Sequence, residues 1–190
     1  MKALEEKIRA EGKIYPGNIL KVTSFLNHQI DVDFMMRMGK EVADRFAGER
    51  IDKILTVETS GIALAMAAAS YLHVPMVFAK KHKSTNMADD NYCAGVHSYT
   101  HNQDYTIVVS REYLRKGERV LIVDDFLAVG NAVNGLMQMV REAGGEVAGI
   151  SVAIEKGFQH GGDALRAQGL HVESLAIVES MGDDSITFRP

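Results

Sequence analysis

The sequence has very little cysteine, because Cys93 is the only one among its 190 residues. A single thiol cannot form an internal disulfide or supply a zinc site built from several cysteines. We therefore expect the chain to work in a reducing compartment, and we predict a cytoplasmic location. Seven histidines are present, but none shows the paired spacing of a metal site. No direct ligation of a metal by protein side chains is predicted.

The sequence also lacks long apolar runs and an excess of basic over acidic residues. The first residues, MKALEEKIRAEGK, carry charges throughout, unlike a signal peptide. No later segment is apolar for long enough to cross a bilayer. Lys and Arg number 21 against 25 Asp and Glu, which gives a net charge of −4, whereas a dedicated nucleic-acid binder normally carries a basic excess. We predict no membrane and no nucleic-acid partner, so any anionic ligand must be held by a local site.

Hydrophobic residues make up 46% of the chain. This is enough for one hydrophobic core, and we predict a single domain spanning 1–190. Apolar segments with strand character alternate with amphipathic helical segments. The expected strands are 54–57, 74–79, 105–110, 120–123, 147–154 and 172–178. The expected helices are 33–46, 62–72 and 132–142, with short ones near the N-terminus and at 163–168. This alternation predicts an α/β domain with a mostly parallel central sheet flanked by helices, and ligands at the carboxyl ends of its strands.

Two carboxylates stand at the end of the strand predicted over 120–123. Asp124 and Asp125 are followed by a short loop that contains Gly130 and then by a helix. Ionised aspartates accept hydrogen bonds from neighbouring ribose hydroxyls, while the amides and the dipole at a helix start favour a phosphate. Gly130 lets the backbone approach a ligand closely. The pattern favours a joint site for sugar and phosphate, although a strand ending in solvent would carry the same residues.

A second anion could lie where Glu58, Thr59, Ser60 and Gly61 join a strand to a helix. The two hydroxyls and the amides of this segment suit a phosphate group. An ordinary helix N-cap would have the same residues, so both interpretations stay open.

Two groups of lysines follow predicted strands. Lys80, Lys81 and Lys83 form a basic cluster suited to a leaving pyrophosphate, although short lysine runs are usually solvated surface. Lys156 follows another strand, with Phe158 near enough in sequence to stack on a planar base. From their positions in the sequence alone, these lysines are only modest evidence for a ligand-binding site.

The string RVLIVDDFLAVGNA, residues 119–132, resembles the phosphoribosyltransferase signature of an apolar strand, two acids, two apolar residues and a phosphate loop. Over almost its whole length the chain resembles the bacterial xanthine-specific group of purine phosphoribosyltransferases, notably in GNILKVTSFLNHQID, DDFLAVGNA and AIEKGF. The resemblance implies a type I phosphoribosyltransferase fold with a small hood over the base site, contributed by residues 15–30 and 156–190, and a flexible loop over 84–108. It also implies a homodimer and Mg²⁺ that arrives with phosphoribosyl pyrophosphate.

The implied reaction is transfer of the 5-phosphoribosyl group from phosphoribosyl pyrophosphate to xanthine, which gives xanthosine 5′-monophosphate and pyrophosphate in purine salvage. The implied catalytic residues are Asp124 and Asp125 at the ribose hydroxyls and Lys81 at pyrophosphate, acting across a dimer interface. The implied donor-binding residues are Ala128, Val129, Gly130, Asn131 and Ala132 around the 5′-phosphate, and Thr59, Ser60 and Gly61 at the leaving group. The implied xanthine-binding residues are Leu20, Asn27 and Lys156.

The phosphate loop departs from the family pattern in two ways. Ala128, Val129 and Ala132 offer no hydroxyl, so backbone amides and Asn131 must hold the phosphate. Ala128 also stands where hypoxanthine-guanine enzymes carry an aspartate proposed as general base. Since xanthine loses a proton near neutral pH, we hypothesise that its anion attacks without such a base.

Two other functions remain open. One is a guanine or hypoxanthine phosphoribosyltransferase, and Asn27, Ala128 and Lys156 are the residues that discriminate it. The other is a nucleotide-sensing regulator on the same fold, which should carry a basic face or a winged domain. The sequence shows neither of these features.

Overall fold

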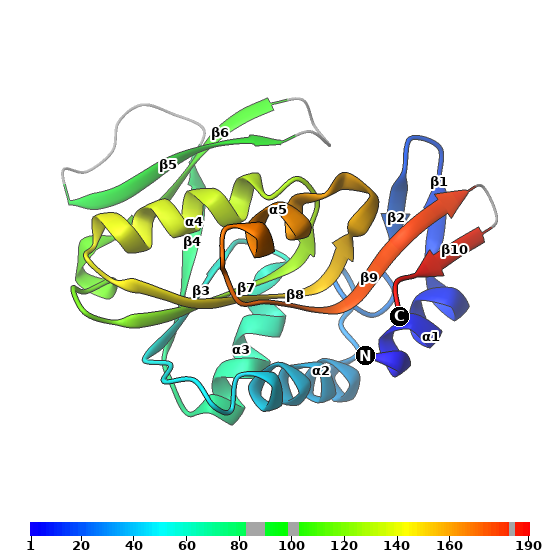
Figure 1. The fold of residues 1–190 in the computed structure, drawn as a ribbon, viewed down its shortest axis with the longest axis horizontal. Helices are drawn as coiled ribbons and strands as arrows, with labels where there is room; N and C mark the ends of the chain where they lie inside the picture. The colour runs from blue at the N-terminus through cyan, green and yellow to red at the C-terminus, as the bar shows by residue number, and fades with distance from the viewer. Residues whose placement is uncertain (83–89, 99–102, 183–184) are drawn as a thin grey trace.

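Residues 1–82, 90–98, 103–182 and 185–190 are described by the structure, a computed structural model, and within them eight strands form one sheet (Figure 1). Its order is β10-β9-β8-β7-β3-β4-β6-β5. The strands are β3 (Lys53–Val57), β4 (Met76–His82), β5 (Asn91–Ser98), β6 (Gln103–Ser110), β7 (Arg119–Leu127), β8 (Glu146–Lys156), β9 (Val172–Gly182) and β10 (Ser185–Phe188).

The centre of this sheet is parallel. The pairs β9–β8, β8–β7, β7–β3 and β3–β4 run in parallel, while β10, β6 and β5 are antiparallel to their neighbours. Parallel neighbours need a crossover, and helices supply it. These helices are α3 (Gly61–Leu72), α4 (Asn131–Glu142) and α5 (Gly161–Ala167). The predicted α/β fold with a mostly parallel sheet flanked by helices is therefore confirmed.

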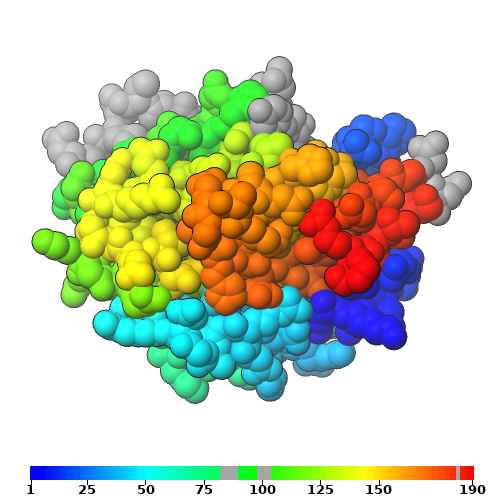
Figure 2. Space-filling model, viewed as in Figure 1, coloured from blue at the N-terminus to red at the C-terminus, as the bar shows by residue number. Residues whose placement is uncertain are grey.

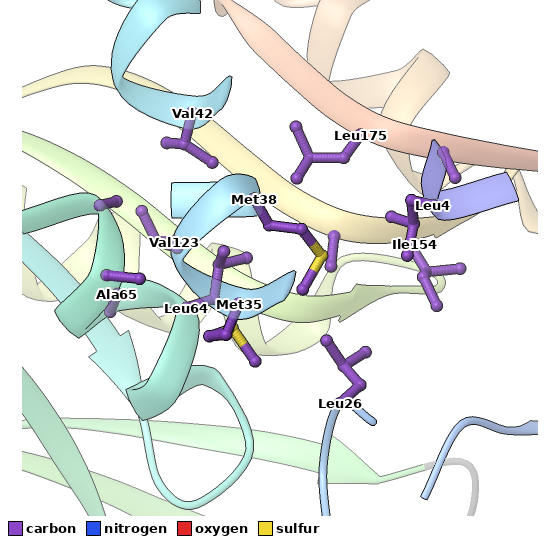
Figure 3. Close-up of a cluster of buried hydrophobic side chains, with 14 of the residues drawn as sticks. Leu4, Leu26, Met35, Met38, Val42, Leu64, Ala65, Val123, Ile154 and Leu175 are labelled. Carbon is purple, nitrogen blue, oxygen red and sulfur yellow. The ribbon is translucent and has the colours of Figure 1, made fainter. Parts of the chain in front are cut away.

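Helices cover both faces of the sheet. Two further helices, α1 (Lys2–Glu11) and α2 (Val32–Arg45), pack with α3 on one face, and α4 and α5 lie on the other (Figure 1). On the first face, Met38 of α2 and Leu64 of α3 meet Val123 of β7 in a buried cluster (Figure 3). Every residue of β3 is buried, as expected of a central strand covered on both sides. None of the helices in the described ranges is long and apolar enough to span a membrane.

The strand that carries the acid pair is longer than predicted. It was expected to end at Val123, but β7 continues through both aspartates to Leu127, because Phe126 and Leu127 pair with β8. The extra length of β8, which runs to Lys156, supplies those backbone partners.

The segment 15–30, implied to form part of the hood, contains a short strand. β1 (Lys13–Tyr15) and β2 (Ile19–Lys21) pair as a separate antiparallel hairpin, with positive φ at Gly17 and Asn18 in its turn. The residues that follow form turns and bends that bury Phe25 and Leu26. The N-terminal helix and the C-terminal residues lie side by side (Figure 2), and Arg9 stacks on the ring of Phe188 at 4.6 Å.

The segment 84–108, expected to be a flexible loop or hairpin, includes β5 and most of β6. These strands form an antiparallel hairpin beside β4. Residues 83–89 and 99–102 lie outside the described ranges, and so does Lys83 of the basic cluster. Closure of this segment over a substrate stays a prediction.

Candidate active site

The parallel strands bring the predicted site segments to one edge of the sheet. β3, β7 and β8 are neighbours, and their carboxyl ends lie on the same side because the strands run in parallel. β3 leads into residues 58–61, β7 carries the acid pair and leads into 128–132, and β8 ends at Lys156. Segments separated by up to about a hundred residues in sequence thus lie at one edge of the sheet.

The acid pair lies against the first residue of α3. Asp124 is only 5% exposed, and its Oδ1 accepts a hydrogen bond from the amide of Asp125 at 2.9 Å. A Cβ added at Gly61 would lie 2.7 Å from the same Oδ1 and 2.2 Å from Oγ1 of Thr56. Only glycine permits this approach, and it joins the segment after β3 to the acids of β7.

Burial controls the charge on Asp124. Loss of solvent, followed by the neighbouring Asp125, raises the pKa of Asp124 well above its usual range, and Lys81 opposes the shift weakly. Burial and the charge of Asp124 also raise the pKa of the Tyr105 hydroxyl. Asp124 is therefore a carboxyl group held where ionisation is costly unless a ligand compensates it.

The loop after β7 opens into α4 through Gly130, which has a φ of 94° and serves as the N-cap. A cavity of about 140 Å³ lies over this loop, lined by Val96, His97 and Tyr105 and by residues 126–133. Among the described residues that line it there is no Lys or Arg. The side chain of Asn131 donates to the carbonyl of His97 at 2.9 Å. Backbone amides at the start of α4 are thus the main donors that the loop offers an anion.

Two hydrogen bonds tie the hood segment to the sheet edge. Asn27 Nδ2 donates to Asp125 Oδ2 at 3.3 Å, while Asn27 Oδ1 is buried and lacks a hydrogen-bond partner among the described residues. Lys156 Nζ donates to the carbonyl of Asn18 at 3.0 Å, two residues before the buried Leu20. Burial lowers the pKa of the Lys156 ammonium. Leu20, Asn27 and Lys156 thus come from the β1–β2 hairpin, the turns after it and the end of β8.

The segment after β3 does not behave as an ordinary capped helix start. Ser60 is the N-cap of α3, yet its side chain makes no capping hydrogen bond, and Thr59 is exposed. The carboxylate of Glu58 accepts instead from the amide of Lys81 at 2.5 Å. Lys81 Nζ lies 5.1 Å from the ring centroid of Tyr105. The Ser60 hydroxyl is therefore not used to cap α3.

Two contributors were missed from the sequence. Tyr105 contacts Lys81 and lines the phosphate-loop cavity, and the hydroxyl of Thr56 is buried without a hydrogen-bond partner in the described part of the chain. Nothing in their local sequence distinguishes them, because each acts through contacts that only the folded sheet creates. Within the ranges described, no three His, Cys, Asp or Glu side chains come together as a metal site.

Comparison with known proteins defines the class. The family model "Phosphoribosyl transferase domain" matches residues 21–164, so the chain belongs to that family. Xanthine phosphoribosyltransferase 1 of Clostridium perfringens is 52% identical over 190 residues, and the alignment covers 100% of both chains. The xanthine phosphoribosyltransferase of Bifidobacterium longum is 52% identical over 192 residues, again with 100% of each chain covered.

Solved structures share the fold at lower identity. Adenine phosphoribosyltransferase from Giardia lamblia, complexed with 9-deazaadenine, gives a TM-score of 0.78 at 21% identity, covering 94% of this chain and 98% of that one. The adenine enzyme from Rhodothermus marinus gives 0.73 at 22% identity, covering 94% and 100%. They confirm the predicted type I phosphoribosyltransferase fold.

Asp124→Asn is expected to stabilise the ligand-free protein at alkaline pH. With a raised folded pKa, the wild-type carboxyl costs no stability below about pH 4, where an unfolded aspartate is also protonated, and the cost grows as the pH rises through the folded pKa. The amide avoids this cost, so the variant should melt about 2–4 °C above wild type at pH 8 and at nearly the same temperature at pH 4.

Asp52→Asn is the control, for which we expect the opposite change in melting temperature. A hydrogen bond from the Arg119 amide lowers the pKa of Asp52, so its ionised form stabilises the fold above the unfolded pKa and the variant should melt lower at pH 8. A melting scan by circular dichroism at both pH values measures this. An Asp124→Asn protein that melts below wild type at pH 8 would contradict the assignment.

Proposed function

We propose that the chain transfers the 5-phosphoribosyl group from phosphoribosyl pyrophosphate to xanthine, giving xanthosine 5′-monophosphate and pyrophosphate in purine salvage. The observation that carries the proposal is that three features share one sheet edge: an acid pair whose Asp124 is buried, a helix start suited to phosphate, and a hood carboxamide whose oxygen has no hydrogen-bond partner among the described residues. The curated relatives that are about half identical over the whole chain, and are named for this reaction, support it.

In this proposal the sugar and its phosphate bind along β7 and the loop after it. Asp124 and Asp125 accept hydrogen bonds from the ribose hydroxyls, which compensates the cost of ionising Asp124. The amides of Ala128, Val129, Gly130, Asn131 and Ala132 surround the 5′-phosphate at the start of α4. The described residues that line this cavity include neither Lys nor Arg, which is consistent with binding through backbone dipoles.

The leaving pyrophosphate would lie beside the segment after β3. Thr59 and Ser60 supply hydroxyls, Gly61 an amide, and Lys81 a positive charge that stabilises the departing anion. The amide of Lys81 is fixed by Glu58, so the start of its side chain is held in one place.

Phosphoribosyltransferases generally use Mg²⁺ with this donor, and we propose the same here. Mg²⁺ is commonly bound through one or two carboxylates together with substrate phosphates. The neighbouring carboxylates of Asp124 and Asp125, without a third ligand in the described part of the chain, fit an ion that arrives on the substrate. When bound, the ion would neutralise charge on the leaving pyrophosphate.

The purine would lie between the hood and the end of β8. Leu20 supplies an apolar surface, and Lys156 can turn its ammonium from the Asn18 carbonyl to a purine oxygen or nitrogen. Asn27 can accept through its unpaired Oδ1 and donate through its amide. A group that both donates and accepts suits the second oxo group and neighbouring N–H of xanthine.

A panel of purines tests the proposal. The protein would be incubated with phosphoribosyl pyrophosphate, Mg²⁺ and each base in turn, and nucleotide formation would be followed by ultraviolet absorbance. We expect kcat/KM for xanthine to exceed that for hypoxanthine by at least about tenfold, because hypoxanthine leaves the Asn27 carboxamide unpaired. Product with guanine or hypoxanthine in preference to xanthine would replace the proposal with its nearest alternative, and no product with any base would refute transferase activity.

Ala128→Asp tests whether xanthine reacts as an anion that needs no general base from the protein. A carboxylate at this position should help a purine that keeps its proton at neutral pH, so kcat/KM for hypoxanthine is expected to rise about tenfold or more relative to xanthine. Ala128→Asn adds similar bulk without a base and serves as the control. Equal changes for the two purines in steady-state rates, or the opposite order, would count against an anionic xanthine substrate.

We also propose that the protein is a homodimer in the cytoplasm. Three large apolar side chains in α3 and β4 are exposed, namely Met66 (57%), Tyr71 (41%) and Phe78 (37%). Phe78 and Lys81 share β4, so a second copy packed on these side chains would lie near the lysine proposed to act across an interface.

Light scattering should give twice the mass of one chain for wild type, and Phe78→Glu should shift the measured mass toward that of one chain. A wild-type protein with the mass of a single chain would refute the dimer.

A further inference from the structure

Glu155 is a fully buried carboxylate that the proposed reaction does not use. It precedes Lys156 in β8 and has no exposed surface. Both of its oxygens bond Arg166 of α5, at 3.0 Å from Nη1 and 2.7 Å from Nη2, and Ser174 of β9 donates a further hydrogen bond. This is a bidentate arginine–carboxylate pair, in which two parallel N–H···O bonds fix both the distance and the relative orientation of the two groups.

The helix held by this ion pair also supports the phosphate loop. Gly161, the first residue of α5, lies so close to the loop that an added Cβ would be 2.1 Å from the carbonyl oxygen of Ala128 and 2.7 Å from the carbonyl carbon of Val129. At the next residue, Gly162, an added Cβ would lie 2.1 Å from Oε1 of Glu155. The first turn of α5 is therefore packed between the Glu155 carboxylate and the backbone that is proposed to hold the 5′-phosphate.

We propose that Glu155 and Arg166 are positioning residues that fix α5, and through Gly161 the 128–132 loop, at the distance from β8 that the ribose phosphate requires. The inference rests on the proposed donor site. Glu155 and Lys156 are consecutive in β8, so the same strand end sets the position of the purine and, through α5, that of the phosphate. Misplacement of such a loop by about 1 Å is enough to cost a large factor in rate or affinity.

The alternative is that the pair only stabilises the fold. Burying two charges is expensive, and well-packed apolar residues of similar volume often stabilise a protein as well or better. A fork-to-fork ion pair adds a fixed geometry that apolar contacts do not supply. An experiment must therefore separate phosphate-loop geometry from stability.

Arg166→Lys is the main variant, because it keeps the charge near Glu155 but loses the fork. Arg45→Lys is its matched control. The Arg45 side chain is of similar exposure, 25% against 31% for Arg166, and it borders the same surface cavity as Arg166. Its Nε and Nη2 donate to one oxygen of Glu41, and its Nη1 donates to Glu173. Within the described part of the chain, Arg45 forms its hydrogen bonds with Glu41, Glu173 and Ser174 and none with the phosphate loop or α5.

The measurement is calorimetric titration of each protein with ribose 5-phosphate, together with its melting temperature and steady-state constants. We expect Arg166→Lys to weaken ribose 5-phosphate binding about tenfold and to raise the KM for the donor more than it lowers kcat. Arg45→Lys should bind within twofold of wild type even if its melting temperature falls as much. Unchanged binding in folded Arg166→Lys, or equal weakening in Arg45→Lys, would overturn the proposal, whereas a wild-type protein that binds no ribose 5-phosphate would refute the donor site itself.

Gly161→Ala tests the same link without touching the ion pair, and it decides the question if Arg166→Lys does not fold. The methyl group must displace the backbone of residues 128–129, so we expect at least a tenfold loss of ribose 5-phosphate affinity. Gly48→Ala is the control, since a Cβ there meets nothing within 4 Å. Wild-type affinity in folded Gly161→Ala would overturn the proposal.

Discussion

Parallel pairing of β3, β7 and β8 is the constraint on which the rest of the site depends. Because these strands run in the same direction, the segments that follow them must emerge at one edge. The close contact of Gly61 with Asp124 is a consequence of that convergence, and the hydrogen bond from Asn27, which lies between β2 and α2, joins the hood to the same edge. β7 lies between the other two strands, so the acid pair is in contact with both the segment after β3 and the hood.

The site places its charges unevenly. Among the described residues that line the cavity at the start of α4 there is neither Lys nor Arg, while Asp124 is buried where its ionisation is costly. In the proposed function this cost is compensated when sugar hydroxyls and a phosphate bind together. The hood would then have a separate task, because Leu20, Asn27 and Lys156 would select the base without taking part in binding the phosphate.

Much of the fold could be predicted from the sequence, because the strands of a parallel sheet are short, apolar and separated by amphipathic helices. With the exception of β5, which lies in the segment expected to be a flexible loop, the strands from β3 to β9 were therefore recognisable. The β1–β2 hairpin and β10 were not, since strands such as Ile19–Lys21 and Ser185–Phe188 are short and partly exposed, and pairing rather than apolar pattern defines them. The acid pair and its loop were recognisable because they are contiguous. The ion pair of Glu155 with Arg166 was not, because eleven residues separate two side chains that look like ordinary surface charges in sequence.

A crystal structure of the protein with xanthosine 5′-monophosphate would test the account most directly. The account predicts the phosphate within hydrogen-bond distance of the amides of residues 129–132, the ribose hydroxyls at Asp124 and Asp125, and the purine between Lys156 and Asn27. A nucleotide whose phosphate lies elsewhere, for example in the arginine-lined cavity between the two termini, would contradict it.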